Sequence, residues 1–131
     1  MVPEHGDFHL GNCLFDGDVG LTGVIDWDLG ACPGMPVLDV LHAVVTTEGT
    51  GRLDGHTAGM LLRGGLPAEA TAALLAYGSA LGIEAGSLAV WVRVYVLVKL
   101  LVPAITRAGE SRDRWVKAVV TPTLEELRGT A

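Results

Sequence analysis

Two short apolar runs near the start of the chain flank a stretch of turn-forming residues. The runs are Cys13–Phe15 and Leu21–Ile25, and the segment between them, residues 16–20, reads "DGDVG". Glycine and aspartate adopt the backbone conformations that tight turns need, so this pattern predicts a β-hairpin. The glycines and prolines within residues 30–36 then predict an irregular connection.

The remainder of the chain follows helical spacing. A first helix is predicted from Pro36, whose missing N–H would be unpaired at that position anyway, to just before Gly49. A second helix is predicted over Leu53–Arg63. A third ends at Gly82, because apolar residues recur before it at helical intervals. These residues are Ala70, Ala73, Leu74, Tyr77 and Leu81.

A fourth predicted helix is apolar on nearly all its faces. Ser87 can cap its start, and residues 87–105 approach the length that spans a membrane. Arg93 and Lys99 interrupt this stretch, and each charge near a bilayer centre costs about 2.5–3.5 kcal/mol. A helix buried at the centre of a soluble body is therefore favoured over a membrane span.

The last predicted helix starts near Ser111, with a break or kink at Pro122 because proline removes a hydrogen-bond donor. The elements together predict an α+β fold that is mainly α. The length of 131 residues favours a single domain over residues 1–131. Within it, residues 1–35 would form the polar loop and hairpin, and residues 36–131 a helical body.

Composition narrows the possible functions. Half of the residues are hydrophobic and 18% are charged, which argues against extended disorder. The net charge of −6 argues against nucleic acid as a partner, since phosphate binding needs clustered basic residues. The polar N-terminus predicts no secretory signal and a cytoplasmic protein, in which Cys13 and Cys32 would be buried free thiols.

The densest polar cluster lies close to the start of the chain. His5, Asp7 and Asn12 share one segment with two glycines, and Asp26 ends the second predicted strand. Pairing of the two strands would bring Asn12 and Asp26 together. An amide oxygen beside a carboxylate suits Mg²⁺, which takes few protein ligands and completes its shell with water and phosphate. Asp7 could then accept a proton from a hydroxyl.

These residues resemble a known family. "HGDFHLGN" (residues 5–12), "VIDW" (residues 24–27) and "PGMPVLDVLHA" (residues 33–43) are similar to motifs of the kinase-like phosphotransferases, most closely the aminoglycoside phosphotransferase and choline kinase group. Protein kinases use a related catalytic-loop Asp and Asn and a second metal-binding Asp. Here Gly6 replaces the Arg of the protein-kinase loop, and residues 25–27 replace D-F-G, as in the small-molecule branch.

The resemblance implies a protein-kinase-like C-terminal lobe, with a short β-hairpin followed by about five helices. It implies an ATP-dependent small-molecule O-phosphotransferase, with Mg²⁺ as cofactor and a small molecule bearing a hydroxyl as substrate. Asp7 would be the catalytic base, and Asn12 and Asp26 would hold the metal. His5 would fix the catalytic loop, and Asp39 would anchor it from the helix below. The substrate-binding residues are not indicated.

The same resemblance implies that a part of the enzyme is missing. In the family, a Gly-rich loop and a Lys-bearing strand precede the catalytic loop, but only four residues precede His5. The N-terminal nucleotide lobe is therefore expected to be absent, either lost or supplied in trans. The chain alone should have little kinase activity, and an apolar patch should be exposed near the hairpin.

Other interpretations stay open for each residue. Asp7 could be a turn or cap residue, Asn12 could favour a left-handed turn beside a glycine, and Asp26 could bind turn amides. Asp39 would be favourable in any first helical turn. A zinc site would need three or four clustered ligands. At the level of function, the alternatives are a non-catalytic remnant or binding module of the same fold, and a plain helical interaction domain.

Overall fold

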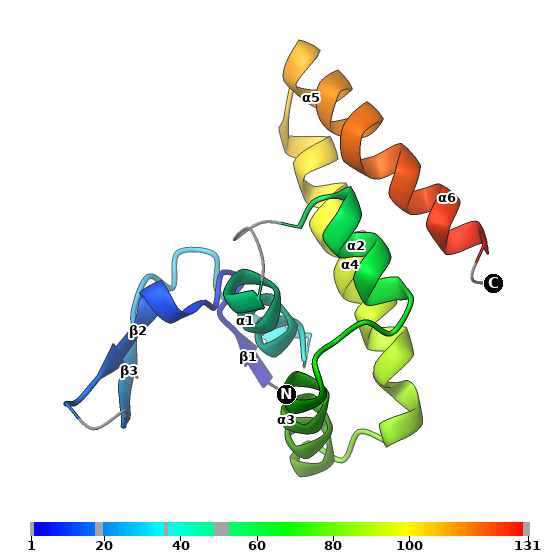
Figure 1. Ribbon diagram of the computed structural model, residues 1–131. Helices are drawn as coiled ribbons and strands as arrows, with labels where there is room; N and C mark the ends of the chain where they lie inside the picture. The colour runs from blue at the N-terminus through cyan, green and yellow to red at the C-terminus, as the bar shows by residue number, and fades with distance from the viewer. Residues whose placement is uncertain (1, 18–19, 36, 49–52, 130–131) are drawn as a thin grey trace.

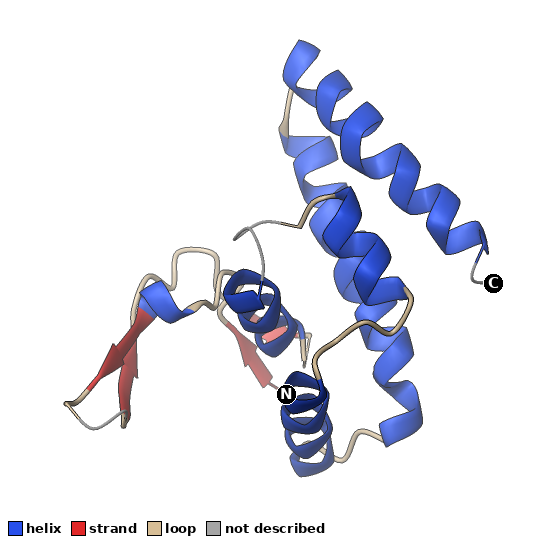
Figure 2. Ribbon diagram, in the orientation of Figure 1, coloured by secondary structure: helices blue, strands red, loops and turns tan. Residues whose placement is uncertain are grey.

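The computed structural model describes residues 2–17, 20–35, 37–48 and 53–129, which form two small sheets and a larger set of helices (Figure 1, Figure 2). β1 (Val2–Glu4) pairs antiparallel with β4 (Ala31–Gly34), and β2 (Cys13–Phe15) pairs antiparallel with β3 (Leu21–Val24). Most of the described residues are helical, so the expectation of a mainly α fold with a small β portion is confirmed.

The predicted hairpin is present as β2 and β3. Cys13 pairs with Val24, and Phe15 pairs with Leu21. The Asp16 carboxylate accepts a hydrogen bond of 2.9 Å from the Gly20 amide, which shows why an aspartate suits the start of this turn. Figure 1 shows the hairpin projecting away from the helices, with its loop end farthest from them.

The β1–β4 sheet corrects the sequence analysis, which predicts no strand at the N-terminus and an irregular connection over residues 30–36. Both strands are only three or four residues long, and β4 contains proline and glycine, so neither carries an alternating pattern. The expected burial of both thiols is also wrong. Cys32 lies exposed on β4, which pairs with β1 alone among the described strands, and Cys13 is only partly buried.

The helices follow the predicted order. They are α1 (Leu38–Glu48), α2 (Gly55–Leu62), α3 (Ala68–Ala80), α4 (Leu88–Thr106), α5 (Gly109–Trp115) and α6 (Thr121–Gly129), with short 3₁₀ turns η1 (Leu10–Asn12) and η2 (Ala85–Ser87). α1 is described as far as Glu48, and its predicted limits at Pro36 and Gly49 lie outside the described residues. Asp54 caps α2 by accepting from the Thr57 amide at 2.8 Å, and Gly82 follows α3 with φ +74°.

The core lies where α1, α2, α3 and α4 meet. Tyr95 and Val96 of α4 and Leu41 of α1 are fully buried, at 0% exposure. The other buried apolar residues are Val37, Leu38, Val45, Leu53, Ala58, Leu61, Leu74, Val92, Leu100 and Val119. α4 contacts α1, α2 and α5, so it occupies the centre of the helical packing.

α4 is central to the helical packing as expected, but the expectation of a buried helix holds for only part of its surface. Only one face is covered, and Val90 and Ile105 are 60% and 79% exposed. By length and composition alone, residues 85–106 could cross a membrane, and 22% of their most apolar window is buried. Ser87 makes no capping side-chain hydrogen bond, because the 3₁₀ turn η2 leads directly into α4.

The helix is not broken at Pro122, where the sequence predicts a break or a kink. α5 continues through a five-residue π-helical segment, Val116–Val120, into α6, and Pro122 is the second residue of α6. Wider π turns re-route backbone hydrogen bonds, which accommodates the missing donor of a proline. α6 then packs along α2, where Arg63 and Glu126 form an ion pair of 2.7 Å.

Candidate functional site

The loop His5–Asn12 follows β1 and is fixed at its first residue. The His5 side chain is buried, and its Nε2 lies 2.8 Å from the carbonyl oxygen of Ile25, just after β3. His5 Nδ1 accepts a hydrogen bond of 3.3 Å from the Asp7 amide, so Nε2 carries the proton and donates to Ile25. The His5 ring also lies 4.7 Å from the Trp27 ring, between centroids. His5 therefore ties the loop to the end of the hairpin.

Asp39, in the first turn of α1, binds the backbone of the same loop. Its two carboxylate oxygens accept from the amides of His5 at 2.6 Å and of Gly6 at 2.9 Å. Gly6 has a φ of +83°, and a Cβ there would lie 2.6 Å from the Leu29 carbonyl oxygen. A side chain does not fit at that position, so only glycine lets the backbone turn toward Asp39.

Lys99 of α4 binds the loop from a second side. Its Nζ donates to the Gly6 carbonyl oxygen at 3.0 Å. Burial lowers the pKa of Lys99, and the charges of Asp7, Asp39 and Glu4 oppose that shift. The backbone of Gly6 thus meets a carboxylate at its N–H and an ammonium at its carbonyl, and both partners belong to helices of the body.

The Asp7 side chain is partly exposed to solvent, and one of its carboxylate oxygens is hydrogen-bonded to His42. Oδ1 lies 2.9 Å from His42 Nε2, and Oδ2 lies 3.8 Å from His9 Nε2. The side chain of Asp7 is 45% exposed. Asp7 therefore presents a partly free carboxylate to solvent from a backbone that is fixed on both sides.

His42 continues from Asp7 into the core. Its Nδ1 lies 3.0 Å from the hydroxyl of Tyr95, which is fully buried. Burial and the nearby Lys99 lower the pKa of His42 below its ordinary value, against the opposing effect of Asp7. Burial also raises the pKa of the Tyr95 phenol, so this hydroxyl keeps its proton.

Asn12 and Asp26 lie at adjoining ends of the two hairpin strands. The Ile25 amide donates to the Asn12 carbonyl at 2.9 Å, which extends the pairing of Cys13 with Val24 by one step. Asn12 is 8% exposed, and its Nδ2 donates to the Asp7 carbonyl at 3.1 Å. Asp26 is exposed and has a left-handed backbone, with φ +64°.

The donor chemistry of these two residues fits Mg²⁺. The amide nitrogen of Asn12 is occupied by Asp7, which leaves its oxygen as the free end of the side chain. Within residues 2–17, 20–35, 37–48 and 53–129, the Asp26 carboxylate has no hydrogen-bond or ion-pair partner. An amide oxygen and a carboxylate are hard oxygen ligands of the kind Mg²⁺ prefers. In the same ranges no three His, Cys, Asp or Glu side chains gather as possible metal ligands.

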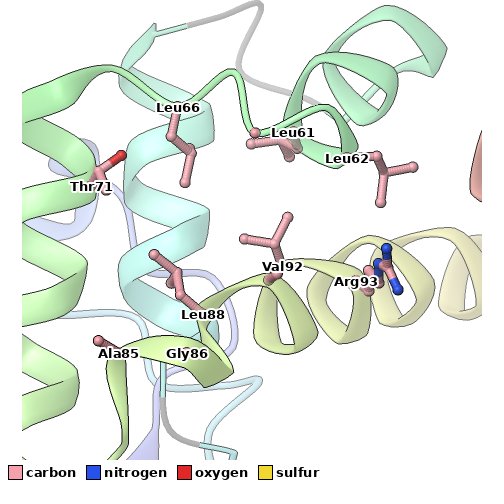
Figure 3. Close-up of a pocket in the computed structure, with 11 residues that line it drawn as sticks. Leu61, Leu62, Leu66, Thr71, Ala85, Gly86, Leu88, Val92 and Arg93 are labelled. Atoms are coloured by element: carbon pink, nitrogen blue, oxygen red, sulfur yellow. The ribbon is translucent and has the colours of Figure 1, made fainter. Parts of the chain in front are cut away.

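Two cavities differ in their relation to the loop. One of about 390 Å³ is lined by Gly6, Asp39 and Lys99, directly behind the loop backbone. The other, of about 350 Å³, lies between α2, α3 and the start of α4 (Figure 3). Leu61, Leu88 and Val92 point into it, and none of its lining residues belongs to the loop. Both volumes are in the range of small-molecule sites, but of these two cavities only the first is lined by residues of the loop and its anchors.

Sequence reasoning missed two residues that contact the loop and a third that lies behind them. His42 contacts Asp7 and Lys99 contacts Gly6, which are 35 and 93 positions away in the sequence, and Tyr95 contacts His42. His42 stands within the motif of residues 33–43, but that motif gave it no role. The spacing of polar residues in the helices gave a weak indication of these contacts. His42 follows Asp39 by three residues, so both lie on one face of α1. Tyr95 precedes Lys99 by four residues in a mostly apolar helix, so these two also share a face.

Comparison with known protein families gives one match. Residues 2–77 match the family model described as "Phosphotransferase enzyme family", a range that includes the loop, the hairpin, α1 and α2. No curated protein and no solved structure matches the chain.

Proposed function

Because the chain belongs to the phosphotransferase enzyme family, we propose that it is the catalytic lobe of an ATP-dependent enzyme that phosphorylates a hydroxyl group of a small molecule. One observation carries this proposal. The loop His5–Asn12 lies within the matched residues, and its backbone is held by Asp39 while the Asp7 carboxylate stays partly exposed. A rigid backbone with a free carboxylate is what a general base needs.

In the proposed reaction Asp7 accepts the proton of the substrate hydroxyl. The hydroxyl oxygen forms a bond to the terminal phosphorus of ATP, the bond to the bridging oxygen breaks, and ADP leaves. Asp7 Oδ1 is held by His42, so Oδ2 is the oxygen that takes the proton. Positioning of the hydroxyl is the main contribution, since phosphoryl transfer asks little covalent chemistry of the protein.

Asn12 and Asp26 are the proposed Mg²⁺ ligands. When bound, the ion would neutralise the charge of the transferring phosphoryl group. The Asn12 side chain is oriented by the Asp7 carbonyl, and the backbone of Asp26 follows the residue bound by His5. The base and the two metal ligands are thus linked through three hydrogen bonds, which join Asn12 Nδ2 to the Asp7 carbonyl, the Asp7 amide to His5 Nδ1, and His5 Nε2 to the Ile25 carbonyl.

A nucleotide-binding lobe, from another segment or another chain, would complete the proposed enzyme. The support is the apolar surface of the hairpin. Leu14, Phe15, Leu21 and Ile25 are 47–55% exposed, and they belong to the hairpin that begins after Asn12 and ends before Asp26. Burying such side chains is favourable, so this surface suits a covering lobe that brings the triphosphate to the metal ligands.

A test of the metal ligands uses the chain itself. Mn²⁺, a paramagnetic substitute for Mg²⁺, should broaden the backbone NMR signals of residues 12 and 26 first. Asp26→Asn should abolish the broadening, because it removes the only charged ligand of the pair. Asp28→Asn is the matched control, since Asp28 is an exposed acid two residues away, and it should change nothing.

A test of the chemistry supplies a nucleotide-binding lobe from the same family ahead of Val2. With ATP and Mg²⁺, a panel of small alcohols should include a substrate. Asp7→Asn should then lower kcat by about 10²–10⁴-fold, the usual contribution of a general base. Broadening centred on another acidic group, or turnover that survives Asp7→Asn, would remove these residues from the proposed roles.

A further inference from the structure

Asp7, His42 and Tyr95 form a continuous hydrogen-bonded row from the protein surface to the core. The distances are 2.9 Å from Asp7 Oδ1 to His42 Nε2 and 3.0 Å from His42 Nδ1 to the Tyr95 hydroxyl. Exposure falls steadily along the row. It is 45% for the Asp7 side chain, 12% for the His42 side chain and 0% for Tyr95. The three residues belong to the loop, to α1 and to α4.

We propose that His42 is a positioning residue for Asp7, and that Tyr95 fixes the His42 imidazole in the tautomer that carries its proton on Nε2. His42 does not reach the reacting atoms in this assignment. It acts by holding one carboxylate oxygen of Asp7, so that the other points to solvent. The inference rests on the proposed function, because it explains how the base of that reaction is oriented.

The direction of each hydrogen bond follows from what the groups can donate. A carboxylate only accepts, so His42 Nε2 must be the donor to Asp7. The Tyr95 hydroxyl has one proton, and His42 Nδ1 is its only partner among the described residues. If Nδ1 were also protonated, the buried hydroxyl proton would have no acceptor in that part of the chain. A neutral imidazole with its proton on Nε2 satisfies both partners.

The surrounding charges support the same state of His42. Lys99 of α4 and His9 of the loop disfavour a positive charge on the His42 imidazole, and burial disfavours it more strongly. Only Asp7 favours the imidazolium. The balance places the pKa of His42 below its ordinary value, so the imidazole is neutral at pH 7.

The hydrogen bond to His42 restricts the orientation of the Asp7 carboxylate, which an isolated aspartate would not experience. Rotation about its side-chain bonds would break the bond to His42, so the carboxylate is restricted to one rotamer. Oδ1 is then occupied, and Oδ2 is the oxygen left for a substrate proton. A base restricted in this way reaches the reactive geometry without ordering its side chain at each turnover.

NMR of the whole chain tests the tautomer directly. Nitrogen-15 spectra that correlate the ring nitrogens with the ring protons should show His42 protonated on Nε2 and unprotonated on Nδ1 at pH 7. Tyr95→Phe removes the donor to Nδ1 and should raise the His42 pKa. Asp7→Asn removes the neighbouring charge and should lower it. Tyr77→Phe is the matched control, since Tyr77 is a half-buried tyrosine on α3, and it should have no effect on His42.

Coupling constants of the Asp7 side chain test positioning. In the wild-type chain and in His42→Gln, which keeps a donor near the same place, Asp7 should occupy one rotamer. In His42→Leu the rotamers should average, while the backbone spectrum stays folded. A His42 protonated on Nδ1 at pH 7, or an Asp7 that stays in one rotamer in His42→Leu, would overturn the inference.

The proposed function and this inference fail separately. Loss of the Mn²⁺ effect at Asp26, with the expected His42 tautomer retained, would reject the metal site and leave the hydrogen-bonded row in place. An intact Mn²⁺ site with the wrong His42 tautomer would reject the row alone.

Discussion

The loop His5–Asn12 and the hairpin β2–β3 are consecutive in sequence but are stabilised in different ways. The loop begins at His5, which is 1% exposed, and its backbone meets Asp39 of α1 and Lys99 of α4. Among the described residues, β2 and β3 pair only with each other, and Phe15 is 47% exposed. The difference shows that the helical body fixes the loop that carries the proposed base and Asn12. The other proposed metal ligand, Asp26, lies at the end of a hairpin whose apolar side chains are largely exposed in the described structure.

The largest effect should come from removing the anchor of the loop. Asp39→Ala deletes two charge-assisted hydrogen bonds and leaves the amides of His5 and Gly6 unpaired. We expect the free energy of unfolding to fall by about 3 kcal/mol, since bonds to charged groups contribute about 1.5–3 kcal/mol each and overlap in part. Urea unfolding measures it, with Asp28→Ala as the control that should stay within about 0.5 kcal/mol of wild type. Equal losses in both variants would contradict the anchoring role.

A smaller effect should appear as pH dependence of stability. The pKa of His42 is lowered in the folded chain, so the unfolded chain binds its proton more tightly. The contribution of His42 is therefore complete above pH 6.5, its ordinary pKa, and is lost as pH falls below that value. Urea midpoints from pH 7.5 to 5 should decline less steeply in His42→Gln than in wild type. A steeper decline in the variant would mean that the shift has the opposite sign.

The smallest effect on stability should come from the hairpin. Phe15→Ser combined with Leu21→Thr removes cross-strand partners that are about half exposed, so the free energy of unfolding should change by only about 0.5 kcal/mol. Self-association should fall clearly, because the exposed apolar surface shrinks. Light scattering on a size-exclusion column measures the mass. Leu75→Thr, on α3 and away from the hairpin, is the control and should leave association unchanged. A wild-type chain that stays monomeric at high concentration would contradict the apolar hairpin as a contact surface.

The sequence predicted features that depend on neighbouring residues and missed those that depend on distant ones. The hydrogen bond between Asp16 and Gly20 and the end of α3 before Gly82 follow from local backbone preferences. The pairing of β1 with β4 does not, since it joins segments about 30 positions apart with no alternation in either.

The same contrast holds for the candidate site. Resemblance to a family identified His5, Asp7, Asn12, Asp26 and Asp39 from three short motifs, and their roles stay predictions. The structure adds where their hydrogen bonds go. In the sequence, Tyr95 and Lys99 are a tyrosine and a lysine within an otherwise mostly apolar helix, with nothing nearby to indicate their partners. Only the crossing of α4 behind α1 brings them to His42 and Gly6.

The left-handed backbone of Asp26 restricts which amino acids can replace it. At φ +64° aspartate, asparagine and glycine are accommodated readily, while longer or branched side chains meet steric conflict with their own backbone. Glutamate, although it bears the same charge, is therefore a poor substitute there. We therefore expect asparagine or glycine to be tolerated at this position, so that replacing Asp26 by either removes the negative charge while the backbone conformation is kept.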